Sequence, residues 1–170
     1  MSDTHLPRFG LVLPRALLDG FEAAGIDRIV HAGDWTDPLA VTLLEAVARV
    51  DGVAGNNDGP VLHERFGTRR VLDIGGVRIG LTHGHLGPGS TTPERARRAF
   101  EDELGLGAIV FGHSHIPLVE RLPSGTWLVN PGSPTDRRRQ PACSWALMTI
   151  EDGSIASVEV VRFARGETGR

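Results

Sequence analysis

Five short polar motifs constrain this chain more than any other feature, because each lies at the end of a predicted strand or in the loop after it. Five of the seven histidines fall in three of these motifs. In chain order, the motifs are Asp3-Thr4-His5, Gly33-Asp34, Gly55-Asn56-Asn57-Asp58, His83-Gly84-His85 and His113-Ser114-His115. In open α/β sheets, ligands bind in the crevice beyond the carboxyl ends of the strands. We therefore expect the five motifs to converge on one site.

Hydrophobic periodicity predicts α/β alternation in the first half of the chain and mostly strands in the second. Gly75-Gly76 predicts a hairpin turn, and Thr92 is the expected N-cap of the third helix. The helices are expected over 13–24, 38–49 and 93–104. Strands are expected over 28–32, 50–54, 70–74, 77–82, 107–111, 118–121, 127–130, 144–150 and 155–163. This order favours a mixed sheet or two packed sheets with helices outside.

Length and composition are those of one ordinary globular domain. The chain has 170 residues, of which 40% are hydrophobic and 23% charged. These values predict a single domain over 1–163 and a disordered tail over 164–170. No apolar stretch approaches the roughly 20 residues of a membrane span, and the N-terminus lacks a signal-peptide pattern, so we expect a cytoplasmic protein. A formal net charge of -3 favours small phosphorylated substrates over nucleic acids.

The motifs supply imidazole, carboxylate and amide oxygen donors. Because Cys143 is the one cysteine, a thiolate zinc cluster is excluded, and the donors suit Mn²⁺, Fe, Ni²⁺ or Zn²⁺. One ion cannot easily use every candidate together with a substrate, whereas two ions about 3.5 to 4 Å apart can. The candidate ligands are Asp3, His5, Asp34, Asn56, His83, His113 and His115.

Taken singly, most of the motifs have an ordinary structural explanation. Asp3-Thr4-His5 alone is typical of a frayed terminus, and Gly33-Asp34 alone of a turn or helix cap. His113-Ser114-His115 indicates a functional site more strongly, because residues i and i+2 of a strand share a face and both imidazoles would point the same way. The order and number of the motifs together favour a functional site.

Three further features stay outside the predicted site. His31 lies within a predicted strand and is expected to be a packed core histidine, and His63 is expected on a solvated helix. Arg137-Arg138-Arg139 is most typical of a solvated loop, and guanidinium groups beside a phosphate site are the less common alternative. The sequence assigns no function to these arginines.

The patterns Asp-x-His, Gly-Asp, Gly-Asn-x-Asp, His-Gly-His and Gly-His-x-His, in this order, resemble those of the calcineurin-like metallophosphoesterases. Thr82-His83-Gly84-His85, Asn130-Pro131-Gly132-Ser133 and the short length resemble the small prokaryotic phosphodiesterases of that superfamily. The resemblance spans residues 2–150. It implies an αββα sandwich, in which two mixed β-sheets pack together and helices flank them. It also implies hydrolysis of a small phosphodiester by water activated between two divalent ions, with Mn²⁺ the first candidate.

The resemblance also implies individual residue functions. One ion would be held by Asp3, His5, Asp34 and His115, and the other by Asp34, Asn56, His83 and His113, with Asp34 bridging the two. His85 and Asp58 would orient these ligands from outside. Many relatives carry histidine where this chain has Asn57, and an amide is not a proton donor of matched pKa. We therefore expect faster hydrolysis of esters with acidic leaving groups.

One departure from the family concerns the first strand. In the family, a hydrophobic strand precedes Asp-x-His, whereas here only Met1 and Ser2 precede it. We expect a fold that lacks this strand. Either residues upstream of Met1 supply it, which we favour, or Asp3 and His5 are poorly held.

Two other functions remain open from the sequence. One branch of the fold resembles the small subunit of the retromer sorting complex and suggests a non-catalytic scaffold. A nucleotide pyrophosphohydrolase or phosphoprotein phosphatase is the other alternative. The complete set of candidate ligands favours an enzyme over the scaffold, and Asn57 disfavours the second alternative.

Overall fold

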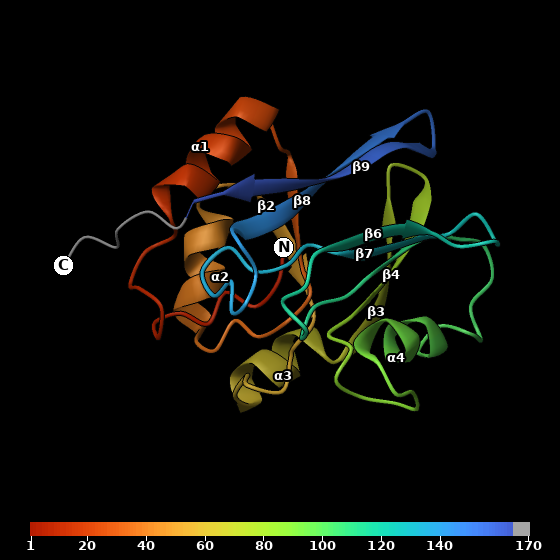
Figure 1. Cartoon of the computed structure of the whole chain (residues 1–170), viewed down its shortest axis with the longest axis horizontal. Coiled ribbons are helices and arrows are strands. Elements are labelled where there is room, and N and C mark those ends of the chain that lie inside the picture. The colour runs from red at the N-terminus through yellow and green to blue at the C-terminus, as the bar shows by residue number, and fades with distance from the viewer. Residues whose placement is uncertain (165–170) are drawn as a thin grey trace.

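A computed structural model describes residues 1–164 and places the helices and strands in four layers (Figure 1). The final six residues of the expected disordered tail lie outside the described residues. The helices are α1 (Arg15–Ala24), α2 (Pro38–Glu45), α3 (Pro60–Phe66) and α4 (Thr92–Arg98). The strands are β1 (Arg28–His31), β2 (Arg49–Gly52), β3 (Arg69–Ile74), β4 (Val77–Thr82), β5 (Leu106–Val110), β6 (Leu118–Arg121), β7 (Trp127–Asn130), β8 (Cys143–Glu151) and β9 (Ser154–Phe163).

The inner layers are a five-stranded sheet and two small sheets. The five-stranded sheet has the order β3-β4-β5-β7-β6, while β1 pairs with β2 in parallel and β8 with β9 in a hairpin. Val30 of β1 and Met148 of β8 both pack in the apolar cluster that contains Ile79, Val110 and Val129 of the five-stranded sheet. The two small sheets therefore cover the same face of the large one.

The outer layers are helical. Phe21 of α1 and Leu44 of α2 pack with Ile29 and Trp145 on the other face of the small sheets, as expected because successive strand side chains point to opposite faces. On the far face of the five-stranded sheet, the cluster around Phe100 includes a buried residue of α4. The order helix, sheet, sheet, helix confirms the predicted αββα sandwich. Among the described residues, none of the helices has the length and apolarity needed to cross a bilayer.

The predicted element boundaries differ from the structure mainly at the helices. Thr91, not Thr92, caps α4, because its hydroxyl accepts a hydrogen bond from the Glu94 amide. The prediction of Thr92 was wrong because proline is tolerated throughout the first turn and so locates the helix start only approximately. The helix expected over 38–49 ends at Glu45, since β2 already begins at Arg49.

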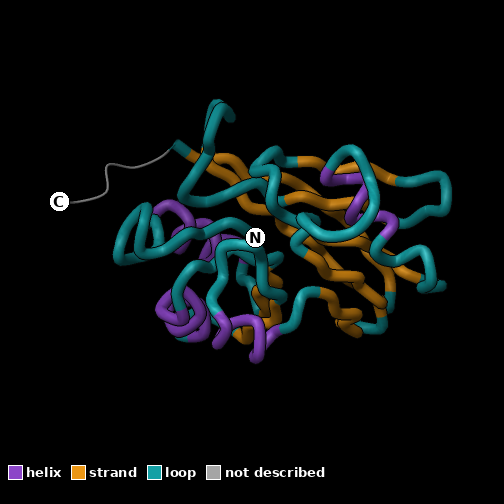
Figure 2. The backbone as a smooth tube through the Cα atoms, turned by 90° about the horizontal axis from the view of Figure 1, so that it is seen from below, coloured by secondary structure: helices purple, strands orange, loops and turns teal. Residues whose placement is uncertain are grey.

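Residues 1–5 form no strand, yet their backbone continues the edge of β1. The Met1 amino group donates to the Val30 carbonyl oxygen (2.8 Å), and the Ala32 amide donates to the Met1 carbonyl (2.9 Å). The Asp3 and His5 amides then donate to the carbonyls of Gly33 and Asp34. Figure 2 shows that the N-terminus lies well inside the outline of the molecule, as in Figure 1. The alternatives of a frayed terminus and of poorly held ligands therefore do not describe this segment.

A cavity of about 400 Å³ lies between β1 and β8. Its lining includes Met1 and Val30 on one side, residues 145–149 of β8 on the other, and Val110 and Val129 of the large sheet. For the described chain, β1 pairs with no strand but β2, and β8 with none but β9, although Met1 hydrogen-bonds to the edge of β1. Burial also lowers the pKa of the Met1 amino group to about 5. The cavity thus lies beside Met1, between the edges of β1 and β8.

An apolar extension before Met1 is expected to enter this cavity and stabilise the protein. Five valine and isoleucine residues added there would bury at least three side chains at ~1.5 kcal/mol each. At ~2–4 °C per kcal/mol for a chain of this size, the melting temperature should rise by roughly 10 °C. A five-residue Gly-Ser extension is the matched control. Equal melting temperatures for the two extended proteins in thermal denaturation would refute the expected strand.

Candidate metal centre

The five motifs meet where strands end and where the N-terminal segment runs alongside the end of β1. Asp34 follows β1, Asn56 follows β2, His83 follows β4 and His113 follows β5. Two groups of buried ligand atoms result, and within each group the atoms lie within 4.8 Å of one another. The first group is Asp3, His5 and His115, and the second is Asp3, Asp34 and His83. These groups contain five of the seven candidate ligands, and Asn56 and His113 are in neither group.

In the first group, two imidazoles face one carboxylate. The Nε2 atoms of His5 and His115 are 3.3 Å apart. Asp3 Oδ1 lies 3.3 Å from His115 Nε2 and 3.9 Å from His5 Nε2. All three side chains are buried. Three potential ligand atoms thus surround one point in the interior.

In the second group, Asp34 occupies the central position. Its Oδ2 atom is 3.3 Å from His83 Nε2 and 3.7 Å from His5 Nε2. Asn56 Oδ1 lies 3.2 Å from the same nitrogen of His83, and the His113 ring centroid lies 5.1 Å from that of His83. One oxygen of Asp34 therefore lies between the two groups, as a bridging ligand must.

The donor atoms fit a divalent cation. Asp3 Oδ1 is buried without a hydrogen-bond partner among the described residues, which is costly for a carboxylate unless a cation compensates it. His83 Nδ1 and His115 Nδ1 lie 2.7 and 2.6 Å from the carbonyl oxygens of Ala32 and Asp136. Because a carbonyl can only accept, each Nδ1 carries the hydrogen, and each Nε2 of the neutral ring is left with a lone pair. This arrangement is typical of metal-ligating histidines.

The charges of the site favour a cation at neutral pH. Burial alone would raise the pKa of Asp34, but His83 and the Asn57 amides hold it well below its usual value. Burial would likewise lower the pKa of His83, whereas its contact with Asp34 raises it. Asp3 raises the pKa of His115 against burial in the same way. Protons therefore compete with a cation for these two histidines, and metal affinity should fall in acid.

The residues expected to assist catalysis have distinct positions. The buried Asp58 carboxylate accepts hydrogen bonds from the backbone amides of Asp34 (3.0 Å), Thr36 (2.7 Å) and Gly55 (2.7 Å), and so ties together the loops after β1 and β2. Exposed Asn57 donates its backbone and side-chain amides to the Asp34 carboxylate, at 2.9 and 2.6 Å. Both residues therefore orient Asp34.

His85 lies beside the second group. Its ring centroid is 5.2 Å from that of His83 and 6.1 Å from that of His113. Burial and the two neighbouring imidazoles lower the pKa of His85 to about 4. His85 is therefore neutral at pH 7 and is not a proton donor there.

The segment after β7 holds Asp3 to His5 in place, which the sequence did not predict. The Ser133 hydroxyl donates to the Asp3 carbonyl (2.7 Å), and the Thr135 hydroxyl donates to the Thr4 carbonyl (2.6 Å). Asp136 accepts from His115 through its carbonyl, as described above. The one available signal was Asn130-Pro131-Gly132-Ser133, which the resemblance singled out without a function.

His31 is buried, as predicted, and also supports this segment. Its ring stacks on Trp35 with centroids 3.6 Å apart. His31 Nδ1 accepts the Gly33 amide hydrogen, so Nε2 carries the proton and donates to the Thr4 hydroxyl. Thr4, between the two candidate ligands Asp3 and His5, is thus fixed from the core.

Replacing Gly55 should destroy the centre. A Cβ atom at this position would lie 2.6 Å from the Asp34 amide nitrogen and closer still to Asp34 Oδ1. Gly55→Ala should therefore displace the Asp34 carboxylate and weaken Mn²⁺ binding by at least ~10-fold, as loss of ligand orientation does elsewhere. Gly59→Ala is the control in the same loop, since nothing lies within 4 Å of its Cβ position. Equal Mn²⁺ affinities of the two variants in calorimetry would contradict this geometry.

Comparisons with known proteins agree with the fold and identify the family. The chain is 34% identical over 166 residues to a probable metallophosphoesterase of Methanothermobacter thermautotrophicus, covering 95% of this chain and 90% of that protein. Wild-type Vps29 of Entamoeba histolytica complexed with Zn²⁺ is 23% identical with a TM-score of 0.73, covering 97% of each chain. A novel archaeal phosphodiesterase is 19% identical with a TM-score of 0.72, covering 96% of this chain and 97% of that one. These two likenesses show the fold alone. Residues 1–153 match the family model of the calcineurin-like phosphoesterase superfamily domain, and the chain belongs to that superfamily.

Proposed function

We propose that this protein hydrolyses a small phosphodiester at a centre of two divalent metal ions, with Mn²⁺ as the first candidate. The observation that carries the proposal is the position of Asp34 Oδ2 between His83 Nε2 (3.3 Å) and His5 Nε2 (3.7 Å). One ion is assigned to Asp3, His5, Asp34 and His115, and the other to Asp34, Asn56, His83 and His113. Membership of the phosphoesterase superfamily supports the reaction class.

Each part of the site has a defined task in this proposal. Divalent ions bound there lower the pKa of water and offset the negative charge of the phosphoryl group. His83 and His115 keep their hydrogens on Nδ1 through the carbonyls of Ala32 and Asp136, so their Nε2 atoms stay directed at the centre. Asp58 and Asn57 hold Asp34 in position.

The protonation states near the centre bear on the substrate. With a pKa of about 4, His85 does not protonate a leaving group at pH 7, and the Asn57 amide does not do so at any pH. Neither side chain then supplies a proton to the leaving group. We expect esters with acidic leaving groups to be the preferred substrates, and one protein of the same fold is described as a phosphodiesterase.

An assay with two model esters tests the proposed function. Bis(4-nitrophenyl) phosphate should be hydrolysed faster than 4-nitrophenyl phosphate in the presence of Mn²⁺, and a chelator should abolish both activities. Asp34→Asn should lower diester turnover by ~100-fold or more, since it removes charge from the oxygen shared by both ions. Exposed Asp73→Asn, outside the site, should change it less than twofold.

Three results would contradict the proposal. No hydrolysis of either ester by Mn²⁺-loaded protein would favour a scaffold of the same fold. A preference for the monoester would favour a phosphatase. Unchanged turnover in Asp34→Asn would remove Asp34 from the reaction.

A further inference from the structure

Arg138 shares an uncommon backbone conformation with five of the seven candidate metal ligands. Residues other than glycine rarely adopt positive φ, and such strain of ~1–3 kcal/mol per residue clusters at functional sites. Two of the residues with positive φ are neither candidate ligands nor Arg138. Asp152 lies in the turn between β8 and β9, and Thr36 lies beside a ligand, with its Oγ1 atom 3.3 Å from His5 Nδ1. Apart from these two and Arg138, every described non-glycine residue with positive φ is a candidate ligand. The full set is Asp3, His5, Asp34, Thr36, His113, His115, Arg138 and Asp152.

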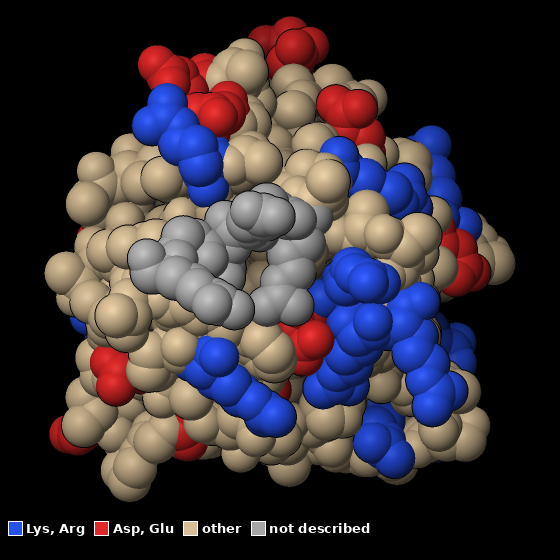
Figure 3. Space-filling model, turned by 60° about the vertical axis from the view of Figure 1, so that its left-hand side comes forward, with Lys and Arg blue, Asp and Glu red and all other residues tan. Residues whose placement is uncertain are grey.

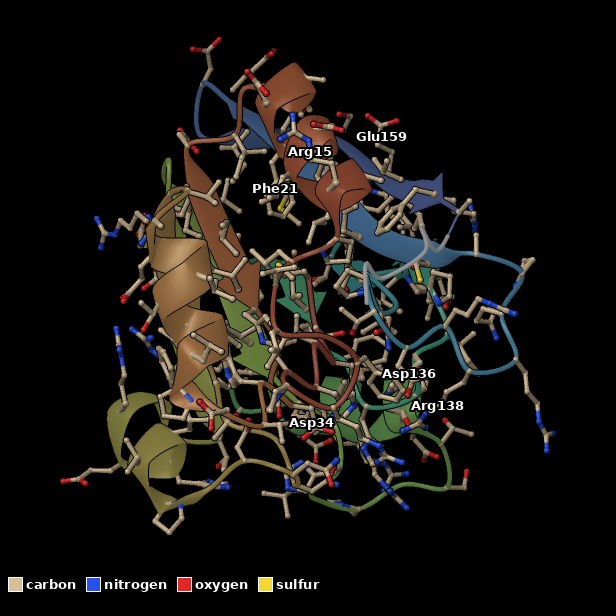
Figure 4. All side chains as sticks on the ribbon, turned by 90° about the vertical axis from the view of Figure 1, so that its left-hand side faces the viewer. Arg15, Phe21, Asp34, Asp136, Arg138 and Glu159 are labelled. Atoms are coloured by element: carbon tan, nitrogen blue, oxygen red, sulfur yellow. The ribbon has the colours of Figure 1, made fainter. Side chains whose placement is uncertain are left out.

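The Arg138 side chain extends toward the two histidines after β5. Its Nη1 atom lies 3.5 Å from the carbonyl oxygen of His113. Asp136, whose carbonyl accepts from His115, also accepts the Arg138 backbone amide on Oδ1 at 3.2 Å and lies 3.8 Å from Arg138 Nε through Oδ2. Figure 4 shows Arg138 and Asp34 on the same side of the molecule, with Asp136 beside Arg138. The residue that fixes His115 therefore also directs the guanidinium group to the edge of the centre.

The guanidinium group retains hydrogen-bonding capacity for a ligand. It carries five N–H donors, while the side-chain contacts at 3.5 and 3.8 Å are long for hydrogen bonds. The side chain is 49% exposed. Arg137 differs, because its Nη1 atom donates to the Gln140 carbonyl at 2.6 Å. The two neighbouring arginines are thus distinguished by their contacts.

We propose that Arg138 binds a non-bridging phosphoryl oxygen of the substrate, an inference that rests on the proposed function. A planar guanidinium fork matches phosphate geometry and keeps its charge at every physiological pH. The 18 basic residues of the chain are all arginine, and Figure 3 shows several basic side chains gathered on one part of the displayed face. Among the described arginines, Arg138 is the one whose side chain contacts the backbone of a candidate ligand. It selects for the phosphoryl group and contributes no proton to the reaction.

Binding of inorganic phosphate to the Mn²⁺-loaded full chain tests this inference without requiring turnover. Calorimetry should show that Arg138→Ala weakens phosphate affinity roughly 10- to 100-fold, the loss expected for a charged hydrogen bond. Arg138→Lys should give an intermediate loss, because lysine keeps the charge but lacks the fork. Arg137→Ala should remain within twofold of the unmodified chain. The Mn²⁺ content of each protein is measured in parallel and should be unchanged.

Several results would overturn the inference. Equal phosphate affinity of Arg138→Ala and the unmodified chain at equal Mn²⁺ content would do so, as would absence of phosphate binding to the unmodified chain. If Arg138→Ala loses metal, Arg138→Lys decides, and unchanged phosphate affinity in that variant overturns the inference. A chain that binds phosphate through Arg138 but hydrolyses no ester would support the inference while contradicting the proposed function.

Discussion

Two buried carboxylates, Asp3 and Asp34, carry negative charges that the surrounding structure has to compensate. A carboxylate removed from water is costly unless hydrogen bonds or cations compensate it. Asp34 is compensated by His83 and by both amides of Asn57. Asp3 receives the His113 amide on Oδ2 but has no hydrogen-bond partner on Oδ1 in the described part of the chain. The uncompensated Oδ1 atom of Asp3 makes the site suited to divalent ions.

To place compensating groups around these carboxylates, loops from both inner layers have to be joined by hydrogen bonds. Asp58 joins the loops after β1 and β2 through three backbone amides. Ser133 and Thr135 connect the segment after β7 to the N-terminal residues. The metal-site end of β1 is therefore rigidly cross-linked, whereas the cavity lies beside the preceding part of the strand. Side-chain hydrogen bonds therefore hold the ligands in place even though residues 1–5 form no strand.

Local signals in the sequence were sufficient for the strands and for the convergence of the ligands. The β4 strand, Val77–Thr82, has the predicted boundaries, because apolar runs bounded by glycine are a short-range pattern. The anchoring of Asp3 by Ser133 was not predictable, since 130 residues separate the two and the Asn130-Pro131-Gly132-Ser133 pattern does not indicate its partner. The orientation of Arg138 was not predictable either, because the sequence does not show its contact partners. Its neighbours Arg137 and Arg139 look identical in sequence, and only the contacts with Asp136 and His113 distinguish it.

In the proposed site, Asp34 is shared by two metal ions. Anomalous diffraction from crystals grown with Mn²⁺ tests this most directly, because it locates each ion without relying on activity. The account predicts two anomalous peaks about 3.5 to 4 Å apart, one on each side of the Asp34 carboxylate. A single peak, or peaks that do not contact Asp34, would contradict it.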